Sequence, residues 1–161
     1  MPSIFIALGS NIDPENNLKA AVTMLRDRHA GPIRFSSVYR SSPLHHEEQD
    51  DFLNAIAAFD AELNPEVVFD MMSHIESKLG KAPPFRFGPR TIDLDLLLHG
   101  SDTYSNPLII PHPRMHERRF VLEPLTELLH PQEKHPTLGK TWGQLLKKTL
   151  DQKIERVRIV L

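Results

Sequence analysis

The segment from Thr91 to Leu98 limits the possible folds of this chain more than any other. It follows a Gly88-Pro89 break, after which polar and apolar residues alternate with the period of a β-strand. One face of this strand would carry Thr91, Asp93, Asp95 and Leu97. The other face would carry Ile92, Leu94, Leu96 and Leu98. The sequence therefore predicts a strand that has two carboxylates on one face and is apolar on the other.

The two carboxylates of this strand are spaced to bind metal. Same-face residues lie about 6 to 7 Å apart along a strand, so Asp93 and Asp95 could hold one divalent cation or bridge two, and carboxylate oxygens favour Mg²⁺. A bound cation would also relieve the repulsion between neighbouring acids. Arg90 precedes the pair and could reach a phosphate oxygen on the same metal. An Asp-x-Asp pair alone is more often the solvated face of an edge strand, and the flanking arginines favour the metal-phosphate interpretation.

Size and composition narrow the class of protein. A chain of 161 residues, 40% hydrophobic and 25% charged, fits one globular domain over residues 1–161. Its net charge of -2 gives no electrostatic basis for binding a nucleic-acid backbone, and without cysteine it can form neither disulfides nor a thiolate site. We find no signal peptide and no apolar run approaching about 20 residues, so we expect a cytoplasmic protein that does not bind membranes. Nothing in the sequence requires an oligomer, and a monomer is expected.

The order of the predicted elements indicates the fold class. Helices are predicted after two cap-proline-acid triplets, which begin at Asp13 and Asn64. Together with the strand at 91–98, the apolar runs give the order strand-helix-strand-strand-helix-strand. This order is typical of a ferredoxin-like αβα sandwich of the α+β class, with a mainly antiparallel sheet. The other predicted strands are 4–8, 33–39, 52–59, 108–110 and 154–160, and further helices are predicted at 115–129 and 142–150.

One motif resembles the signature of a known enzyme family. The pattern Arg86-x-Gly88-Pro89-Arg90-x-x-Asp93-Leu94-Asp95-Leu96-Leu97 is similar to that of the 6-hydroxymethyl-7,8-dihydropterin pyrophosphokinases. Further blocks that resemble the family are Ala7–Asn11, Ser36–Leu44, Gln49–Ala55 and Pro111–Leu125, so the resemblance spans Ile4 to about Leu129. It implies transfer of pyrophosphate from ATP to the hydroxymethyl group of the pterin, with AMP as the other product, in folate biosynthesis.

The resemblance also implies roles for individual residues. Asp93 and Asp95 would hold two Mg²⁺ ions. The pterin would be bound by Ser42, Pro43, Leu44, Phe52, Asn54 and Phe120. ATP would be bound by Glu76, Lys81, Arg90, His112 and Arg118. The catalytic group would consist of Lys81, Arg86, Arg90, Asp93 and Asp95.

Simpler interpretations of these residues stay open. Phe52 also fits a core residue, Asn54 one that satisfies the backbone, His112 one that stabilises a turn, and Arg118 a solvated helix face. Compared with the commoner family pattern, Lys81 replaces an arginine and so loses its planar fork. The fine contacts to the nucleotide and pterin are affected by departures at Phe52, Ser73, Phe87, Pro107, Ile109 and Pro113.

Two rival functions use the same residues. A nucleotide hydrolase or nucleotidyltransferase could employ the acid pair but would attack the γ- or α-phosphorus. A binding module without catalysis could take up a pterin or nucleotide, although it would not need both acids together with Arg90.

Overall fold

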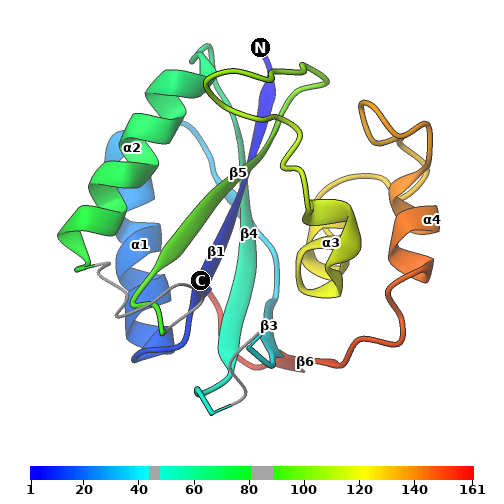
Figure 1. Cartoon of the computed structure of the whole chain (residues 1–161). Coiled ribbons are helices and arrows are strands. Elements are labelled where there is room, and N and C mark those ends of the chain that lie inside the picture. Colours follow the sequence, from blue (N-terminus) through cyan, green and yellow to red (C-terminus); the bar gives the residue numbers. More distant parts are fainter. Residues whose placement is uncertain (44–47, 81–88) are drawn as a thin grey trace.

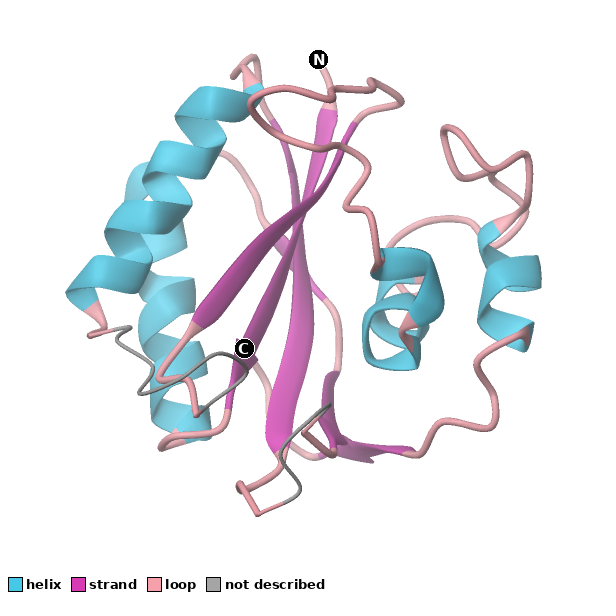
Figure 2. Ribbon diagram, viewed as in Figure 1, coloured by secondary structure: helices cyan, strands magenta, loops and turns pink. Residues whose placement is uncertain are grey.

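The computed structural model describes residues 1–43, 48–80 and 89–161, and the sheet and helices within them follow the predicted order. The strands are β1 (Ser3–Ser10), β2 (Arg34–Phe35), β3 (Val38–Ser41), β4 (Phe52–Asp60), β5 (Asp93–His99) and β6 (Ile154–Val157). The helices are α1 (Pro14–Arg28), α2 (Pro65–Lys78), the 3-10 turn η1 (Met115–Glu117), α3 (Arg119–Leu125) and α4 (Trp142–Lys147). Figures 1 and 2 show the sheet between two layers of helices.

The sheet has the topology expected of a ferredoxin-like fold. Its strand order is β5-β1-β4-β3-β6, with β2 also paired to β4. Every pairing among the described strands is antiparallel. β1 lies between β5 and β4, and β5 forms one edge of the sheet. The predicted ferredoxin-like αβα sandwich with a mainly antiparallel sheet is therefore confirmed.

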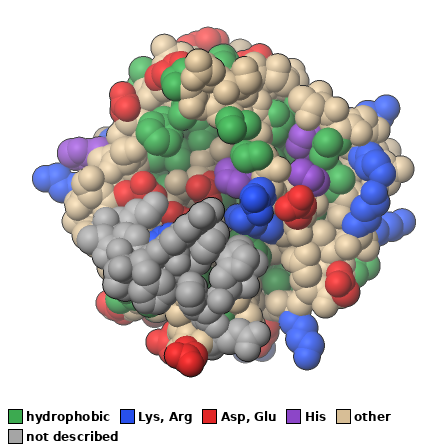
Figure 3. Space-filling view, viewed as in Figure 1, with side chains coloured by type: hydrophobic (Ala, Val, Ile, Leu, Met, Phe, Trp, Pro, Cys, Tyr) green, Lys and Arg blue, Asp and Glu red, His purple; other side chains and the backbone are tan. Residues whose placement is uncertain are grey.

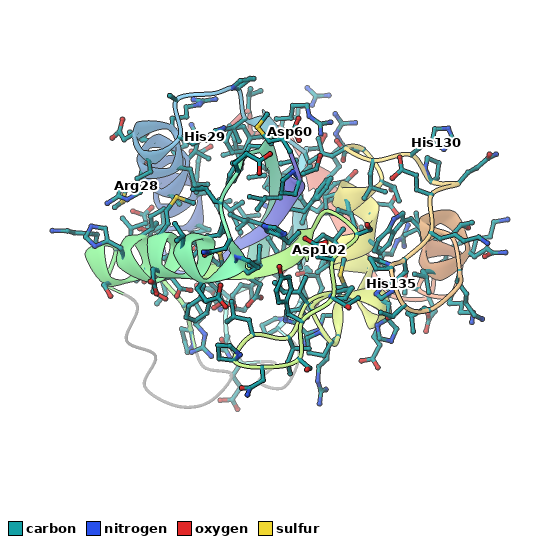
Figure 4. The ribbon with its side chains drawn as sticks, turned by 90° about the horizontal axis from the view of Figure 1, so that it is seen from above. Arg28, His29, Asp60, Asp102, His130 and His135 are labelled. Atoms are coloured by element: carbon teal, nitrogen blue, oxygen red, sulfur yellow. The ribbon has the colours of Figure 1, made fainter. Side chains whose placement is uncertain are left out.

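Both faces of the sheet are covered, so the central strands are apolar on both sides. On one face, α1 and α2 bury Leu18, Leu25, Val68, Met72 and Ile75 against β1 and β4. On the other face, α3 and α4 bury Val121, Leu122, Leu125, Trp142 and Leu145. Viewed from above, Arg28 and His29 at the end of α1 lie on the opposite side of the sheet from His130 and His135 (Figure 4).

The two helix starts that were predicted from proline triplets differ in their caps. Asn64 accepts a hydrogen bond from the backbone N–H of Val67 at 3.0 Å, as expected of an N-cap. Asp13 occupies the N-cap position of α1 but makes no capping hydrogen bond, and its φ of 43° lies in the left-handed region. Its carboxylate instead accepts from the Asn16 side chain at 3.1 Å. The helix boundary was predicted correctly, whereas the capping role of Asp13 was wrong.

Two predicted strands also differ from the structure. The strand expected at 33–39 is interrupted between β2 and β3, where Ser36 Oγ accepts the Ile56 N–H at 2.8 Å and donates to Ser37 O. At this point the Ser36 hydroxyl, and not a backbone carbonyl, accepts the hydrogen bond from the neighbouring strand. The segment 108–110 forms no strand, only a single bridge between Tyr104 and Ile110.

The helix predicted over 115–129 is broken at Arg118. Its backbone is extended there, with φ of -120° and ψ of 113°, and separates η1 from α3. An extended residue cannot continue the i to i-4 hydrogen bonds of a helix. The break places Arg118 and Phe120 beside the cavity described below.

Candidate functional site

A cavity of about 410 Å³ lies on the α3 side of the sheet. β1, β4 and β5 form its floor, and the segment from His112 to Val121 forms one wall. The lining residues are Ala7, Leu8, Gly9, Ser41, Ser42, Phe52, Asn54, Arg90, Asp93, Asp95, Leu97, His112, Pro113, Arg114, Arg118, Phe120 and Val121. Figure 3 shows acidic, basic and histidine side chains gathered near the centre of this face of the molecule.

Small residues on β1 keep the floor of this cavity open. Gly9 pairs with Asp93 on one neighbouring strand and with Asn54 on the other, and Ala7 pairs with Asp95. A Cβ atom on Gly9 would lie 3.5 Å from Asn54 Oδ1 and 3.8 Å from Phe52 Cδ1. Glycine at this position therefore leaves the space between the acid pair and the Phe52 side of the cavity free.

The acid pair lies where the strand period predicted it. Asp93, Asp95 and Leu97 line the cavity, while Leu94 and Leu96 are buried on the opposite face. The prediction is wrong for Leu98, which packs on the α3 side. Ile6 pairs with Leu96 but Phe5 pairs with Leu98, so a bulge at this point reverses the alternation.

Helix α2 stabilises the strand that carries the acids. Glu76 accepts a hydrogen bond from the Leu94 backbone N–H at 2.9 Å, across the outer edge of β5. This contact satisfies a donor on the edge of the sheet. Glu76 is absent from the described lining of the cavity, and its predicted contact with ATP stays a prediction.

Arg90 combines a fixed backbone with a guanidinium nitrogen that is buried without a partner among the described residues. Its N–H donates to Asn11 Oδ1 at 2.7 Å, and its carbonyl accepts the Asn11 N–H at 3.1 Å. Its Nη1 is buried without a hydrogen-bond partner among the described residues. A buried cationic donor is costly to leave unpaired, and a bound anion would supply the missing acceptor.

His112 is held as a neutral hydrogen-bond donor. Its backbone N–H donates to Leu97 O at 3.0 Å, and its Nδ1 accepts the Arg114 backbone N–H at 3.2 Å. Burial, followed by the charges of Arg118 and Arg114, lowers the pKa of His112 from 6.5 to about 4, against the opposing effect of Asp93. Because Nδ1 is an acceptor, the ring proton lies on Nε2.

We expect His112 of the free protein to stay neutral from pH 8 to about pH 5, because its pKa is about 4. Unfolding returns this pKa to about 6.5, so between these values the unfolded chain binds a proton that the folded chain does not. The stability linked to His112 is therefore fully present above pH 6.5 and is lost as the pH falls toward 4.

Ring-nitrogen NMR checks this expectation. The His112 signals, assigned by their loss in His112→Gln, should show a protonated Nε2 at pH 7. The variant should also lose part of the decline in unfolding free energy between pH 6.5 and 4. A ring that titrates near pH 6.5 would contradict the environment described here.

Among the described residues, the arginines that line the cavity are Arg90, Arg114 and Arg118. The Arg118 guanidinium lies 5.9 Å from the centre of the Phe120 ring, within range of a cation-π contact. Arg114 was not among the predicted site residues, although it belongs to the Pro111–Leu125 block that carried the resemblance. Gly9 was not predicted as a floor residue either, because a glycine at a strand end is also explained by the turn that follows it.

The residues predicted to bind a pterin are only partly brought together. Ser42, Phe52, Asn54 and Phe120 line the cavity, whereas Pro43 is buried and absent from the described lining. Asn54 Nδ2 donates to Tyr39 O at 3.1 Å and to Ser41 Oγ at 2.8 Å, so the alternative that this amide satisfies its neighbours also holds. Three predicted residues lie outside the described part of the chain: Leu44, Lys81 and Arg86.

Among residues 1–43, 48–80 and 89–161 there is no group of three or more His, Asp or Glu side chains placed to hold a metal. Asp93 and Asp95 form a pair of carboxylates at the cavity.

Among the described residues, none of the helices has the length and apolar character that crossing a membrane requires.

The fold and cavity define a class of protein: a ferredoxin-like sandwich whose site combines paired carboxylates with arginines suited to an anion. The family model described as 7,8-dihydro-6-hydroxymethylpterin-pyrophosphokinase (HPPK) matches residues 5–130. This chain belongs to that family, whose members are pyrophosphokinases.

Curated relatives agree with this assignment. The 2-amino-4-hydroxy-6-hydroxymethyldihydropteridine pyrophosphokinase of Bacillus subtilis is 42% identical over 140 residues, covering 85% of this chain and 84% of the relative. The protein of the same name from Haemophilus influenzae is 41% identical, covering 80% of this chain and 82% of the relative.

A solved structure supports the fold. A Plasmodium falciparum HPPK-DHPS with pteroate aligns with a TM-score of 0.72 at 15% identity. The alignment covers 93% of this chain and 42% of the solved chain, so this chain spans less than half of that protein.

Proposed function

We propose that this protein transfers pyrophosphate from ATP to the hydroxymethyl group of 6-hydroxymethyl-7,8-dihydropterin. The products would be AMP and the pterin diphosphate, a step of folate biosynthesis. One observation carries the proposal: the described lining of one cavity brings together the Asp93–Asp95 pair, three arginines and the Phe52 and Phe120 rings. Family membership supplies the substrates, since the relatives are named for this pterin.

Asp93 and Asp95 fit a role in holding Mg²⁺. They lie on one face of β5 at the cavity, opposite Gly9 and Ala7, whose small side chains leave room beside them. Their oxygens are of the kind that Mg²⁺ prefers, and two ions are proposed because each carboxylate can hold one beside the substrate phosphates. When bound, the metal would neutralise the triphosphate and make the β-phosphorus more open to attack.

The cationic side of the cavity would hold the polyphosphate. Arg90 offers a buried guanidinium donor, Arg118 a second guanidinium, and His112 a neutral Nε2–H donor. These groups would stabilise negative charge as it shifts toward the α-phosphate. Lys81 and Arg86 are proposed to assist, and Glu76 to contact the nucleotide.

The aromatic side of the cavity would hold the pterin. Phe52 on β4 and Phe120 on α3 both line it, and a flat heterocycle is bound well by two aromatic walls. Ser42 and Asn54 offer polar groups for the ring edge, and Pro43 and Leu44 are proposed to complete this part.

The reaction depends mainly on how the two substrates are positioned. The pterin hydroxymethyl oxygen forms a bond to the β-phosphorus, the bond from that phosphorus to the α,β-bridging oxygen breaks, and AMP leaves with that oxygen. The hydroxyl proton passes to solvent or to a phosphate oxygen. No covalent enzyme intermediate is required, and alignment of the two substrates in one cavity would supply much of the rate.

We also propose that residues 1–161 form one domain that acts as a monomer in the cytoplasm. The described sheet and both helix layers pack into two contiguous cores on its faces, which supports one domain. Gel filtration at working concentration tests the monomer.

A nucleotide assay tests the proposed reaction directly. The purified protein is mixed with ATP, Mg²⁺ and 6-hydroxymethyl-7,8-dihydropterin, with controls lacking pterin or containing excess chelator. We expect AMP and pterin diphosphate in equal amounts only in the complete mixture. ADP, or AMP formed without pterin, would favour a hydrolase or nucleotidyltransferase, and tight binding without turnover would favour a binding module.

A further inference from the structure

Asn11 is a buried amide that lies beside the cavity without lining it. It follows β1 in the turn that leads to α1, and only 4% of its surface is exposed. Gly9, two residues earlier, forms part of the cavity floor, but Asn11 is not among the lining residues. A buried amide in such a place needs partners for its donors and acceptors.

The Asn11 side chain joins two segments that are distant in the sequence. Its Nδ2 donates to Gln49 Oε1 and to the backbone carbonyl of Asp50, both at 3.0 Å. Its Oδ1 accepts the Arg90 backbone N–H at 2.7 Å. Both amide hydrogens and one acceptor site are therefore used, and the backbone N–H adds a bond to Arg90 O at 3.1 Å.

These two segments lead into opposite sides of the cavity. Asp50 lies just before β4, which carries Phe52 and Asn54. Arg90 lies just before β5, which carries Asp93. Ser10 Oγ also donates to Arg90 O, at 3.4 Å, but among the described residues its side chain makes no hydrogen bond to the segment before β4.

We propose that Asn11 is a positioning residue that couples the pterin side of the cavity to the phosphate side, an inference that rests on the function proposed above. Its amide fixes the start of β4 relative to Arg90, so the pterin and the ATP phosphates are held at the right distance and angle for transfer. It touches neither substrate in this arrangement and acts through Asp50 and Arg90.

Two substitutions separate the two arms of this link, which are the amide donors to residues 49 and 50 and the amide acceptor for the Arg90 N–H. Asn11→Asp keeps an acceptor for the Arg90 N–H but removes the donors to residues 49 and 50. The Asp50 carbonyl is an acceptor only, so it cannot donate to the new carboxylate and that contact is lost. Asn11→Ala removes both arms. Asn16→Ala, which removes an exposed amide hydrogen-bonded to Asp13, is the matched control.

Steady-state kinetics should show different patterns for the two variants. For Asn11→Asp we expect the KM for pterin to rise about tenfold, with the KM for ATP changed less than about twofold. For Asn11→Ala we expect kcat to fall about 10- to 100-fold with both KM values raised, by analogy with the loss of a hydrogen-bond partner that orients a metal-ligating residue. Asn16→Ala should match the wild type.

The assay separates failure of this inference from failure of the proposed function. If the wild type forms no pterin-dependent AMP, the proposed function is wrong. If the wild type turns over and Asn11→Asp keeps its pterin KM within twofold, the coupling role is overturned. A merely structural role would lower kcat through a smaller folded fraction and leave both KM values unchanged, which would also overturn it; thermal unfolding measures that fraction.

Discussion

Asp95→Asn should lower kcat by about a thousandfold while the protein stays folded. The substitution keeps the shape of the side chain but removes a carboxylate at the cavity, opposite Ala7. If Asp95 helps to hold Mg²⁺ against the triphosphate, its loss removes several kcal/mol of charge stabilisation, and about 4 kcal/mol corresponds to that factor. Pterin-dependent AMP formation at saturating Mg²⁺ measures the effect.

The control for Asp95 is another carboxylate that lies far from the cavity. Asp70 is exposed on α2, and Asp70→Asn should keep normal turnover. Circular dichroism and thermal unfolding should show that Asp95→Asn is folded, because strand β5 keeps its pairing with β1. A variant with a near-normal rate would rule out the two-metal assignment.

Arg90→Ala should lower kcat/KM for ATP by about 100- to 1,000-fold, the range for losing one preorganised donor. The backbone of Arg90 is fixed by Asn11, so the substitution removes only the guanidinium. Because Nη1 is buried without a partner among the described residues, its removal should not lower the unfolding temperature of the free protein. Loss of activity without loss of stability is thus the expected signature.

A charge-retaining variant refines the test of Arg90. Arg90→Lys should recover part of the rate, since it restores the charge but not the planar fork that can bind two phosphate oxygens. Arg28→Ala is the control, because Arg28 lies at the end of α1 on the far side of the sheet (Figure 4). A normal kcat/KM for ATP in Arg90→Ala would mean that Arg90 does not bind the phosphates.

Local patterns predicted the elements that carry the site. The alternation in 93–97 gave the strand and put both acids on one face, and the triplets at Asp13 and Asn64 marked the starts of α1 and α2. Such patterns act over a few residues, so they can be found without knowing the rest of the fold. They failed where a single residue changed the local geometry, as at Ser36, Arg118 and the bulge before Leu98.

The family, the order of the elements, and the residues available for metal and phosphate all follow from the amino-acid sequence. Which of these residues meet depends on the folded arrangement. Arg114 joins the cavity, burial makes His112 neutral, and Asn11 bridges partners 38 and 79 positions away in the chain. Contacts of that separation depend on how the strands pair and the helices pack, and no short sequence pattern contains this information.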